Sequence, residues 1–398
     1  MRRRSTSAIA TFCLLVTLAC GTARAETRAA AGQEAAPGGQ ADSPALFKDL
    51  SVDASLTLVA QHPDRRDARG GPLNARADVE VELPAGNFGD AEGKLFAHLR
   101  AGGGRGVDVG AYATPNATVF DRSVFPVVMQ AWYQLDIPVG AAEGRPGRVE
   151  VTVGQIDPFV LFDGNRIAAD ESEHFLNLAF VHNPLLDAGG DIGTGKNGSS
   201  PGLRLAYVHG LSGSGSITAA IGLFGSGRGA DFADAFDKGL AIGQLEYEGT
   251  MFNDLRGAYR LYAWTNGNAA DLNDDTQRHA GWGFSLDQQL AGHVTLFSRL
   301  GFSTRGEVGV DRACTLGAQI GGGLWGRAND RIGLAAGRLS SSRESGLSGT
   351  ERPLELYYAW QAGEKIQITP SLQWIREPGG DAGVRAVSVW GLRAKLSY

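Results

Sequence analysis

One stretch near the middle of the chain concentrates side chains that could bind a polar solute. Between residues 156 and 201, charged groups are interleaved with phenylalanines: Asp157, Phe159, Phe162, Asp163, Arg166, Asp170, Glu173 and Phe175. Carboxylates and guanidinium groups bind hydroxyls through hydrogen bonds, and aromatic rings pack against C–H faces. A narrow passage that carries both kinds of group is suited to a hydroxyl-rich solute. The structural alternative is that each phenylalanine only packs against its surroundings.

Motifs for catalysis, nucleotides or metals are incomplete elsewhere in the sequence. Residues 190–196 fit the phosphate-binding pattern G-x-x-x-x-G-K, but Asn197 follows where the motif needs a magnesium-binding hydroxyl. Asp271, Asn273 and Asp275 begin like a calcium loop that then lacks its glycine and its closing glutamate. No serine has the spacing of a nucleophile elbow, and the histidines form no H-E-x-x-H pair. We therefore expect no enzyme activity, no cofactor and no bound metal.

The N-terminus predicts export. Arg2–Arg4 are followed by an apolar run, Ala8–Ala19, and then by the cleavage pattern Ala23–Ala25. The apolar run is too short to span a bilayer as a helix. Residues 1–25 are therefore predicted to be a signal peptide, and residues 26–48, rich in alanine, glycine and proline, a flexible tail.

Charge and cysteine content restrict the partners of the exported chain. Removal of the predicted signal peptide takes away four arginines and no acidic residue, so the formal charge changes from −6 to −10. An acidic chain is unsuited to nucleic acid, which needs a basic face. A lipid anchor on Cys20 is an alternative, but Thr17 stands where such signals prefer leucine. After cleavage Cys314 is the single cysteine, so no intramolecular disulfide can form.

After residue 50 the chain alternates apolar and polar residues, as half-buried strands do. Residues 52–58, 77–83 and 131–137 are clear examples. The pattern predicts sixteen strands, each close to the about 9 to 11 residues with which a tilted strand crosses a bilayer. They cover residues 50–60, 74–83, 92–101, 128–138, 148–155, 202–210, 215–224, 239–248, 255–264, 281–290, 293–302, 315–323, 331–338, 353–363, 366–376 and 384–398.

The even number of strands, and connections that are alternately long and short, are typical of an outer-membrane β-barrel. A soluble β-sandwich or propeller is the alternative, because both also contain many short alternating strands. The last strand favours the barrel, because five of its residues place apolar groups on one face: Trp390, Leu392, Ala394, Leu396 and Tyr398. A terminal aromatic residue resembles the signal read by the outer-membrane assembly machinery, although most such proteins end in phenylalanine. We predict an all-β fold, a closed antiparallel transmembrane barrel over residues 49–398.

Residues 156–201 form the longest connection and lack the alternation. By parity this is the third external loop, and we expect it to fold into the barrel. Asp170 and Glu173 have the spacing of a capping box, which predicts a short helix whose apolar face, with Phe175 and Leu178, packs against the inner wall. A helix that lies over the rim is the alternative. On the wall, four arginines are predicted to face inwards, opposite the acidic loop: Arg100, Arg204, Arg256 and Arg260.

Six short blocks around this loop resemble the central region of the OprB-type carbohydrate-selective porins. They are Gly154–Pro158, Phe162–Asn165, Ala169–Glu171, Phe175–Asn177, Phe180–Pro184 and Pro201–Leu203. Members of that family are 16-stranded outer-membrane barrels whose inward loops narrow the channel and favour sugars. The resemblance therefore implies that this loop forms the constriction, and that its charged and aromatic side chains, together with the wall arginines, lie along the path of the solute.

The resulting hypothesis is an integral outer-membrane porin for passive, carbohydrate-selective diffusion of small solutes. The residues before Leu50 suggest no plug domain and no binding box for an energy-transducing partner, so we expect transport to follow the gradient. Two alternatives stay open: a porin for other small solutes, such as phosphate or organic acids, and a closed structural barrel. The expected partners are sugars, outer-membrane lipid and the assembly machinery, whereas the sequence does not decide between a monomer and a homotrimer.

Overall fold

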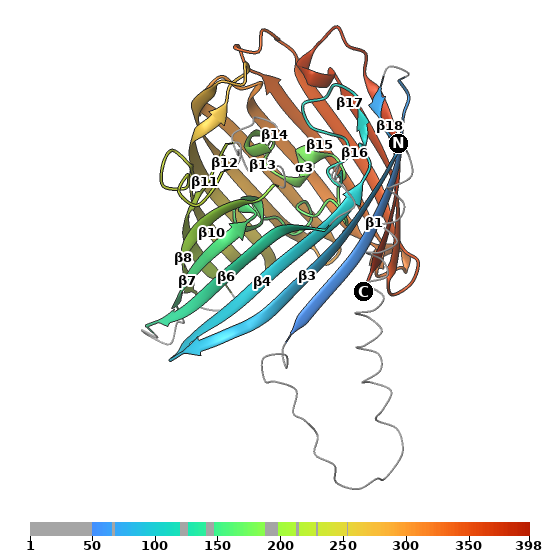
Figure 1. The fold of residues 1–398 in the computed structure, drawn as a ribbon. Coiled ribbons are helices and arrows are strands. Elements are labelled where there is room, and N and C mark those ends of the chain that lie inside the picture. Colours follow the sequence, from blue (N-terminus) through green and yellow to red (C-terminus); the bar gives the residue numbers. More distant parts are fainter. Residues whose placement is uncertain are drawn as a thin grey trace.

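The computed structural model describes residues 50–398, apart from 66–67, 120–125, 141–146, 188–197, 212–214, 228–229 and 253. Its main feature is a closed antiparallel barrel of sixteen strands (Figure 1). The barrel strands are β1 (Ser51–Pro63), β3 (Leu73–Phe88), β4 (Ala91–Gly103), β6 (Val127–Val139), β7 (Gly147–Ile156), β8 (Ser200–Gly210), β9 (Ser216–Phe224), β10 (Leu240–Met251), β11 (Leu255–Ala270), β12 (Thr276–Ala291), β13 (Val294–Arg305), β14 (Val310–Gly321), β15 (Arg331–Ser341), β16 (Thr350–Gln361), β17 (Ile366–Arg376) and β18 (Val387–Ser397). A separate two-stranded sheet pairs β2 (Arg69–Gly70) with β5 (Val107–Asp108).

All sixteen predicted strands are present, and several extend beyond their predicted ends. Strand β3, for example, continues to Phe88. Strand β1 closes the barrel by pairing with β18, from Ser55 opposite Ser397 to Pro63 opposite Val389. Closure gives the backbone groups of both terminal strands a partner, which a sheet within a bilayer requires.

The orientation of the side chains distinguishes this barrel from a soluble β-sandwich. In β17 the polar side chains of Thr369 and Gln373 are almost fully buried on the inner face, whereas Trp374 on the outer face is 44% exposed. Leu245 and Leu261 likewise have more than half of their surface exposed. A soluble sandwich buries its apolar row, but a membrane barrel turns that row towards lipid. The sandwich alternative is therefore wrong.

The helices are short and lie in the connections. Three helices of four residues each, α2 (Pro158–Leu161), α3 (Leu178–Val181) and α4 (Pro184–Asp187), occur between β7 and β8. Two 3₁₀ helices, η3 (Gly322–Trp325) and η4 (Pro378–Gly380), follow β14 and β17. Among the described residues, no helix has the length and hydropathy needed to cross a membrane.

The helix predicted from the capping box at Asp170 is replaced by a single turn. The carbonyl of Asp170 accepts a hydrogen bond from the N–H of His174 over 2.7 Å. The turn does not continue as a helix, because the Glu355 carboxylate on β16 accepts hydrogen bonds from the N–H groups of Leu176 and Asn177, each over 2.8 Å. Those N–H groups are then unavailable for helical bonds, and α3 begins instead with Asn177 as its N-cap.

Residues 1–49 lie outside the described part of the chain. The signal peptide at residues 1–25 and the flexible tail at 26–48 therefore remain predictions, as does the assignment of residue 49 to the barrel, whose first strand begins at Ser51. The incomplete phosphate-binding pattern at residues 190–196 also falls outside the described residues.

Candidate pore constriction

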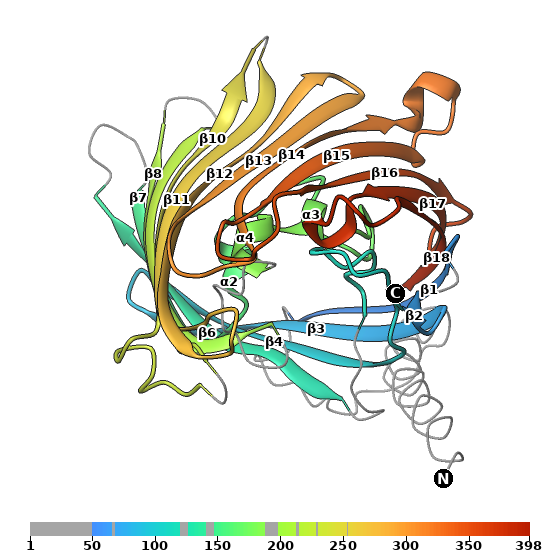
Figure 2. The same ribbon diagram turned by 90° about the horizontal axis from the view of Figure 1, so that it is seen from above.

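Two connections, rather than one, run through the inside of the barrel. The internal loop, residues 157–187 with α2, α3 and α4, lies within the ring of strands when the barrel is viewed from above (Figure 2). A companion segment, residues 104–119 between β4 and β6, pairs with it: the N–H of Ala117 donates to the carbonyl of Leu176 over 2.8 Å. Only the internal loop was predicted there from the sequence. The companion segment also lacks strand alternation, which is the signal that could have identified it.

Aromatic side chains attach the internal loop to the wall. The ring of Phe175 is fully buried and packs against Phe297 on β13 and Tyr357 on β16, with centroids 5.5 Å and 5.0 Å apart. Phe162, only 1% exposed, packs edge-on against Phe224 on β9 at 6.1 Å. Phe162 was predicted to lie along the solute path. The structure places it between the loop and the wall, which agrees with the alternative that it only packs against its surroundings.

A buried ion pair fastens the first half of the loop to β13. The Arg299 guanidinium lies 2.9 Å from the Asp163 carboxylate and also donates to the carbonyls of Phe180 and Asp163, over 2.8 Å and 3.1 Å. Asp163 has φ of 66°, which is uncommon for a residue with a side chain. Its carboxylate accepts further bonds from the Tyr262 hydroxyl (2.8 Å) and the N–H of Asn183 (2.6 Å). Asp163 therefore anchors the loop to the wall.

A second buried arginine holds the acidic turn of the loop. Arg393 on β18 donates to three loop carbonyls, those of Glu171 (2.9 Å), Glu173 (2.7 Å) and His174 (2.8 Å). The same turn receives Lys395, whose ammonium lies 2.8 Å from the Glu173 carboxylate. Charge-assisted bonds of this kind are stronger than neutral ones. The backbone of the turn is thus fixed by the wall, and its carboxylates are left to face the lumen.

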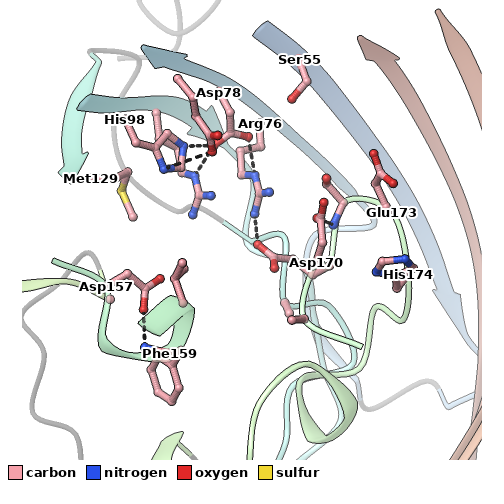
Figure 3. Close-up of a pocket in the computed structure, with 18 of the residues that line it drawn as sticks. Ser55, Arg76, Asp78, His98, Met129, Asp157, Phe159, Asp170, Glu173 and His174 are labelled. Atoms are coloured by element: carbon pink, nitrogen blue, oxygen red, sulfur yellow. Dashed lines mark hydrogen bonds and ion pairs between the residues drawn. The ribbon is translucent and has the colours of Figure 1, made fainter. Parts of the chain in front are cut away.

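A cavity of about 1050 Å³ separates the internal loop from β1, β3, β4 and β6. Figure 3 shows Asp157 and Phe159 on one side of it and Arg76, Asp78 and His98 on the other. Six of the residues predicted from the sequence line this cavity: Arg100, Asp157, Phe159, Arg166, Asp170 and Glu173.

The other predicted arginines face inwards elsewhere on the wall. Arg204 on β8 pairs with Glu150 on β7 over 2.8 Å, and Arg260 on β11 pairs with Asp287 on β12 over 3.2 Å. Arg256 lies exposed at the beginning of β11. None of the three is among the residues that line the cavity in the described part of the chain.

A charged network that was not predicted from the sequence joins the wall to the loop. The Asp78 carboxylate on β3 binds Arg76 (2.8 Å), Arg100 (2.6 Å) and His98 (2.8 Å). Arg76 also pairs with Glu171 on the loop, so the network crosses the cavity. These wall residues share the inward face of β3 and β4, and Asp78 lies directly opposite Arg100 in the register. Their shared face could have predicted the contacts among the wall residues. It could not have predicted the contact with Glu171 on the loop.

The acidic turn of the loop is ionised. Burial by itself raises the pKa of Asp170, but the Lys395 ammonium, 3.9 Å away, and other neighbouring positive charges hold that pKa at about 2. Burial also opposes ionisation of Glu171 and Glu173, yet Arg76 lowers the pKa of the Glu171 carboxyl and Lys395 lowers that of Glu173. Negative charge on the loop therefore faces positive charge on β3, β4 and β18 across the cavity.

The opposite side of the cavity carries Asp157, Phe159 and His182, whose environment is less charged. Asp157 caps α2 by accepting a hydrogen bond from the N–H of Phe159 over 2.9 Å, and burial raises the pKa of Asp157 to about 7. The His182 ring stacks on Phe159 with centroids 4.1 Å apart. Burial lowers the pKa of His182 to about 4, so its imidazole is uncharged at neutral pH. A ring and hydrogen-bonding groups thus lie together here, facing the charged network.

The chain resembles known porins in both sequence and fold. Residues 71–398 match the family described as "Carbohydrate-selective porin, OprB family". The high-pH structure of Pseudomonas putida OprB superposes with a TM-score of 0.65 and 20% identity, and covers 88% of this chain and 94% of that one. Its low-pH structure gives a TM-score of 0.50 at 18% identity (88% and 92% covered), and the outer membrane channel DcaP of Acinetobacter baumannii gives 0.50 at 11% (88% and 97%). No curated protein sequence matches the chain.

The structural likenesses establish the fold, and the family match establishes the relationship. The family match extends from residue 71, near the start of β3, to the C-terminal residue. The matched family is one of porins, which are channels rather than enzymes. This chain belongs to the OprB family of carbohydrate-selective porins and is an integral β-barrel protein of the outer membrane.

Proposed function

We propose that this porin lets small carbohydrates diffuse passively across the outer membrane, through the cavity between the internal loop and strands β1 to β6. The observation that carries the proposal is the composition of that cavity. Charged hydrogen-bonding groups from β3 and β4 lie opposite the aromatic pair of Phe159 and His182. A sugar needs both, because its hydroxyls bind polar groups and its C–H face packs against rings.

The predicted residues divide into two groups within this proposal. Asp157, Phe159, Arg166, Asp170, Glu173 and Arg100 line the cavity and would touch the solute. Phe162 and Asp163 act indirectly, by holding the loop against β9 and β13. The inward arginines Arg204, Arg256 and Arg260 belong to the wider solute path, outside the cavity itself.

Passive diffusion is expected because a sugar crosses such a passage by exchanging hydrogen bonds. A sugar exchanges hydrogen bonds to water for hydrogen bonds to fixed protein groups, and it must leave as readily as it enters. Fixed groups lower the cost of each exchange, because the loop is already held by Arg299 and Arg393. Movement is then driven by the concentration gradient alone.

Two further parts of the proposal concern the whole protein. Residues 1–25 act as an export signal, and the C-terminal strand with Tyr398 is received by the outer-membrane assembly machinery. Tyr398 extends the pairing of β18, because its N–H donates to the carbonyl of Ala54 over 2.9 Å. The barrel then functions in lipid as a monomer or a homotrimer.

Planar-bilayer recording on the mature chain tests the proposal. We expect single channels whose current is reduced by glucose or maltose in a concentration-dependent way. A current reduced by phosphate or an organic acid, but not by sugar, would favour a porin for other solutes. Complete absence of conductance from folded protein would favour a closed structural barrel. Heat-denatured protein at the same concentration is the control for leakage.

A further inference from the structure

The positive charge on the cavity wall is already paired with carboxylates. Arg76 pairs with Asp78 over 2.8 Å and with Glu171, and Arg100 pairs with Asp78 over 2.6 Å. Lys395 lies 2.8 Å from the Glu173 carboxylate. Opposite charges in contact cancel one another at a distance, so these cations present little net attraction to a passing anion.

One further arginine that lines the cavity is also paired with a carboxylate. Arg166 on the internal loop pairs with the fully buried Asp287 carboxylate on β12. Four of the five basic side chains on the cavity therefore have a carboxylate partner, and the fifth, Arg105, lies exposed to water. Exposed charges are screened by salt much more than partly buried ones.

Acidic side chains exceed basic ones on the same surface, seven to five. Two of these acids, Asp53 and Glu80, are exposed and therefore screened. Asp157 is different, because it is partly buried beside α2. One of its carboxylate oxygens caps that helix, and within the described part of the chain no lysine or arginine forms an ion pair with it.

We propose that this cavity passes cationic and neutral solutes in preference to anionic ones, and that the Asp157 carboxylate sets the preference. The inference rests on the proposed channel function and specifies its solutes. Among sugars of similar size, amino sugars and neutral sugars pass faster than uronic acids. Glu171 and Arg100 also face Asp157: the Glu171 charge opposes ionisation of the Asp157 carboxyl, and the Arg100 charge favours it.

The test is the reversal potential of single channels in a potassium chloride gradient at pH 8.5. We expect the wild-type channel to pass potassium more readily than chloride. In Asp157→Asn the permeability ratio should fall by about threefold, because one unit charge close to a permeating ion in water changes the ratio by that order. Asparagine is also a good N-cap, so this variant keeps the bond to Phe159. Glu364→Gln, in the exposed turn between β16 and β17, is the matched control and should leave the ratio unchanged.

A second measurement needs no variant. Vesicles that contain the wild-type channel should swell faster in glucosamine and glucose than in glucuronate at pH 7. A wild-type preference for chloride, faster entry of glucuronate, or an unchanged ratio in Asp157→Asn would overturn the inference while leaving a working channel. Absence of any conductance would overturn the channel function itself and the selectivity with it.

Discussion

Arg299 of β13 and Asp163 of the internal loop form an ion pair in which both side chains are fully buried, 2.9 Å apart. The same guanidinium holds the carbonyl of Phe180, so one wall residue fixes two points of the loop. The internal loop is therefore attached firmly to the barrel wall at this point.

Removal of this arginine should loosen the loop. In Arg299→Met the Asp163 carboxylate stays buried without its cation, which typically costs about 3 to 5 kcal/mol of the free energy of unfolding. Urea titration in lipid vesicles, followed by tryptophan fluorescence, measures that loss. The double variant Asp163→Asn with Arg299→Met removes both charges and should recover part of it. Equal stability of the single variant and the wild type would contradict the role of the pair.

Arg393 should not be replaceable by lysine. Its planar guanidinium reaches three carbonyls of the acidic turn, whereas an ammonium is a compact point charge on a flexible stem. We expect Arg393→Lys to lower the free energy of unfolding by about 2 to 4 kcal/mol, the worth of one or two charge-assisted bonds. Arg352→Lys is the matched control: Arg352 pairs with Glu377 in a partly exposed site, where such a pair contributes about 1 kcal/mol or less. Similar losses in the two variants would contradict this interpretation.

The contact between Arg76 and Glu171 crosses the cavity, so removing it should widen the passage. In Glu171→Ala the loop loses its tie to β3, although the Asp78 network keeps Arg100 and His98 in place. We expect larger single-channel conductance and weaker reduction of the current by glucose. Asp311→Asn removes a carboxylate on β14 outside the cavity lining and serves as the control. Unchanged conductance in Glu171→Ala would show that this contact does not limit the passage.

The cation preference should rise with pH. Burial raises the pKa of Asp157 to about 7, so its carboxyl is mainly neutral at pH 5.5 and mainly charged at pH 8.5. His174 and His182 do not contribute in this range, because burial lowers the pKa of each to about 4. The ratio of potassium to chloride permeability should therefore increase between these two values in the wild type and stay flat in Asp157→Asn. Equal pH dependence in both proteins would assign the titration to another group.

The strands could be predicted from the sequence because the alternation that specifies them is local. Strand β17, for example, was predicted at residues 366–376 and runs from Ile366 to Arg376. Each residue of such a strand faces either lipid or lumen. Apolar and polar residues therefore alternate, and this alternation can be recognised within a few consecutive residues. The interruption after residue 156 was equally visible, and it identified the internal loop.

Short sequence patterns were not sufficient to predict the structure of the loop inside the lumen. The capping box at Asp170 predicted a helix, but the Glu355 carboxylate, about 180 residues along the chain, binds the N–H groups that the helix would have used. Phe162 and Asp163 have the composition of a solute-binding pair, yet both are buried in the seam with the wall. Whether an inward side chain is an anchor or a lining group depends on what stands opposite it.

The sequence by itself therefore determined the barrel, its strand count and one of the two segments that leave the wall. The tertiary structure decided which wall residue meets which part of that segment. Arg299 lies 119 residues from Phe180 in the sequence, and Arg393 lies 222 residues from Glu171. Such contacts are set by the closure, tilt and register of the whole barrel, and no short pattern of residues can encode them.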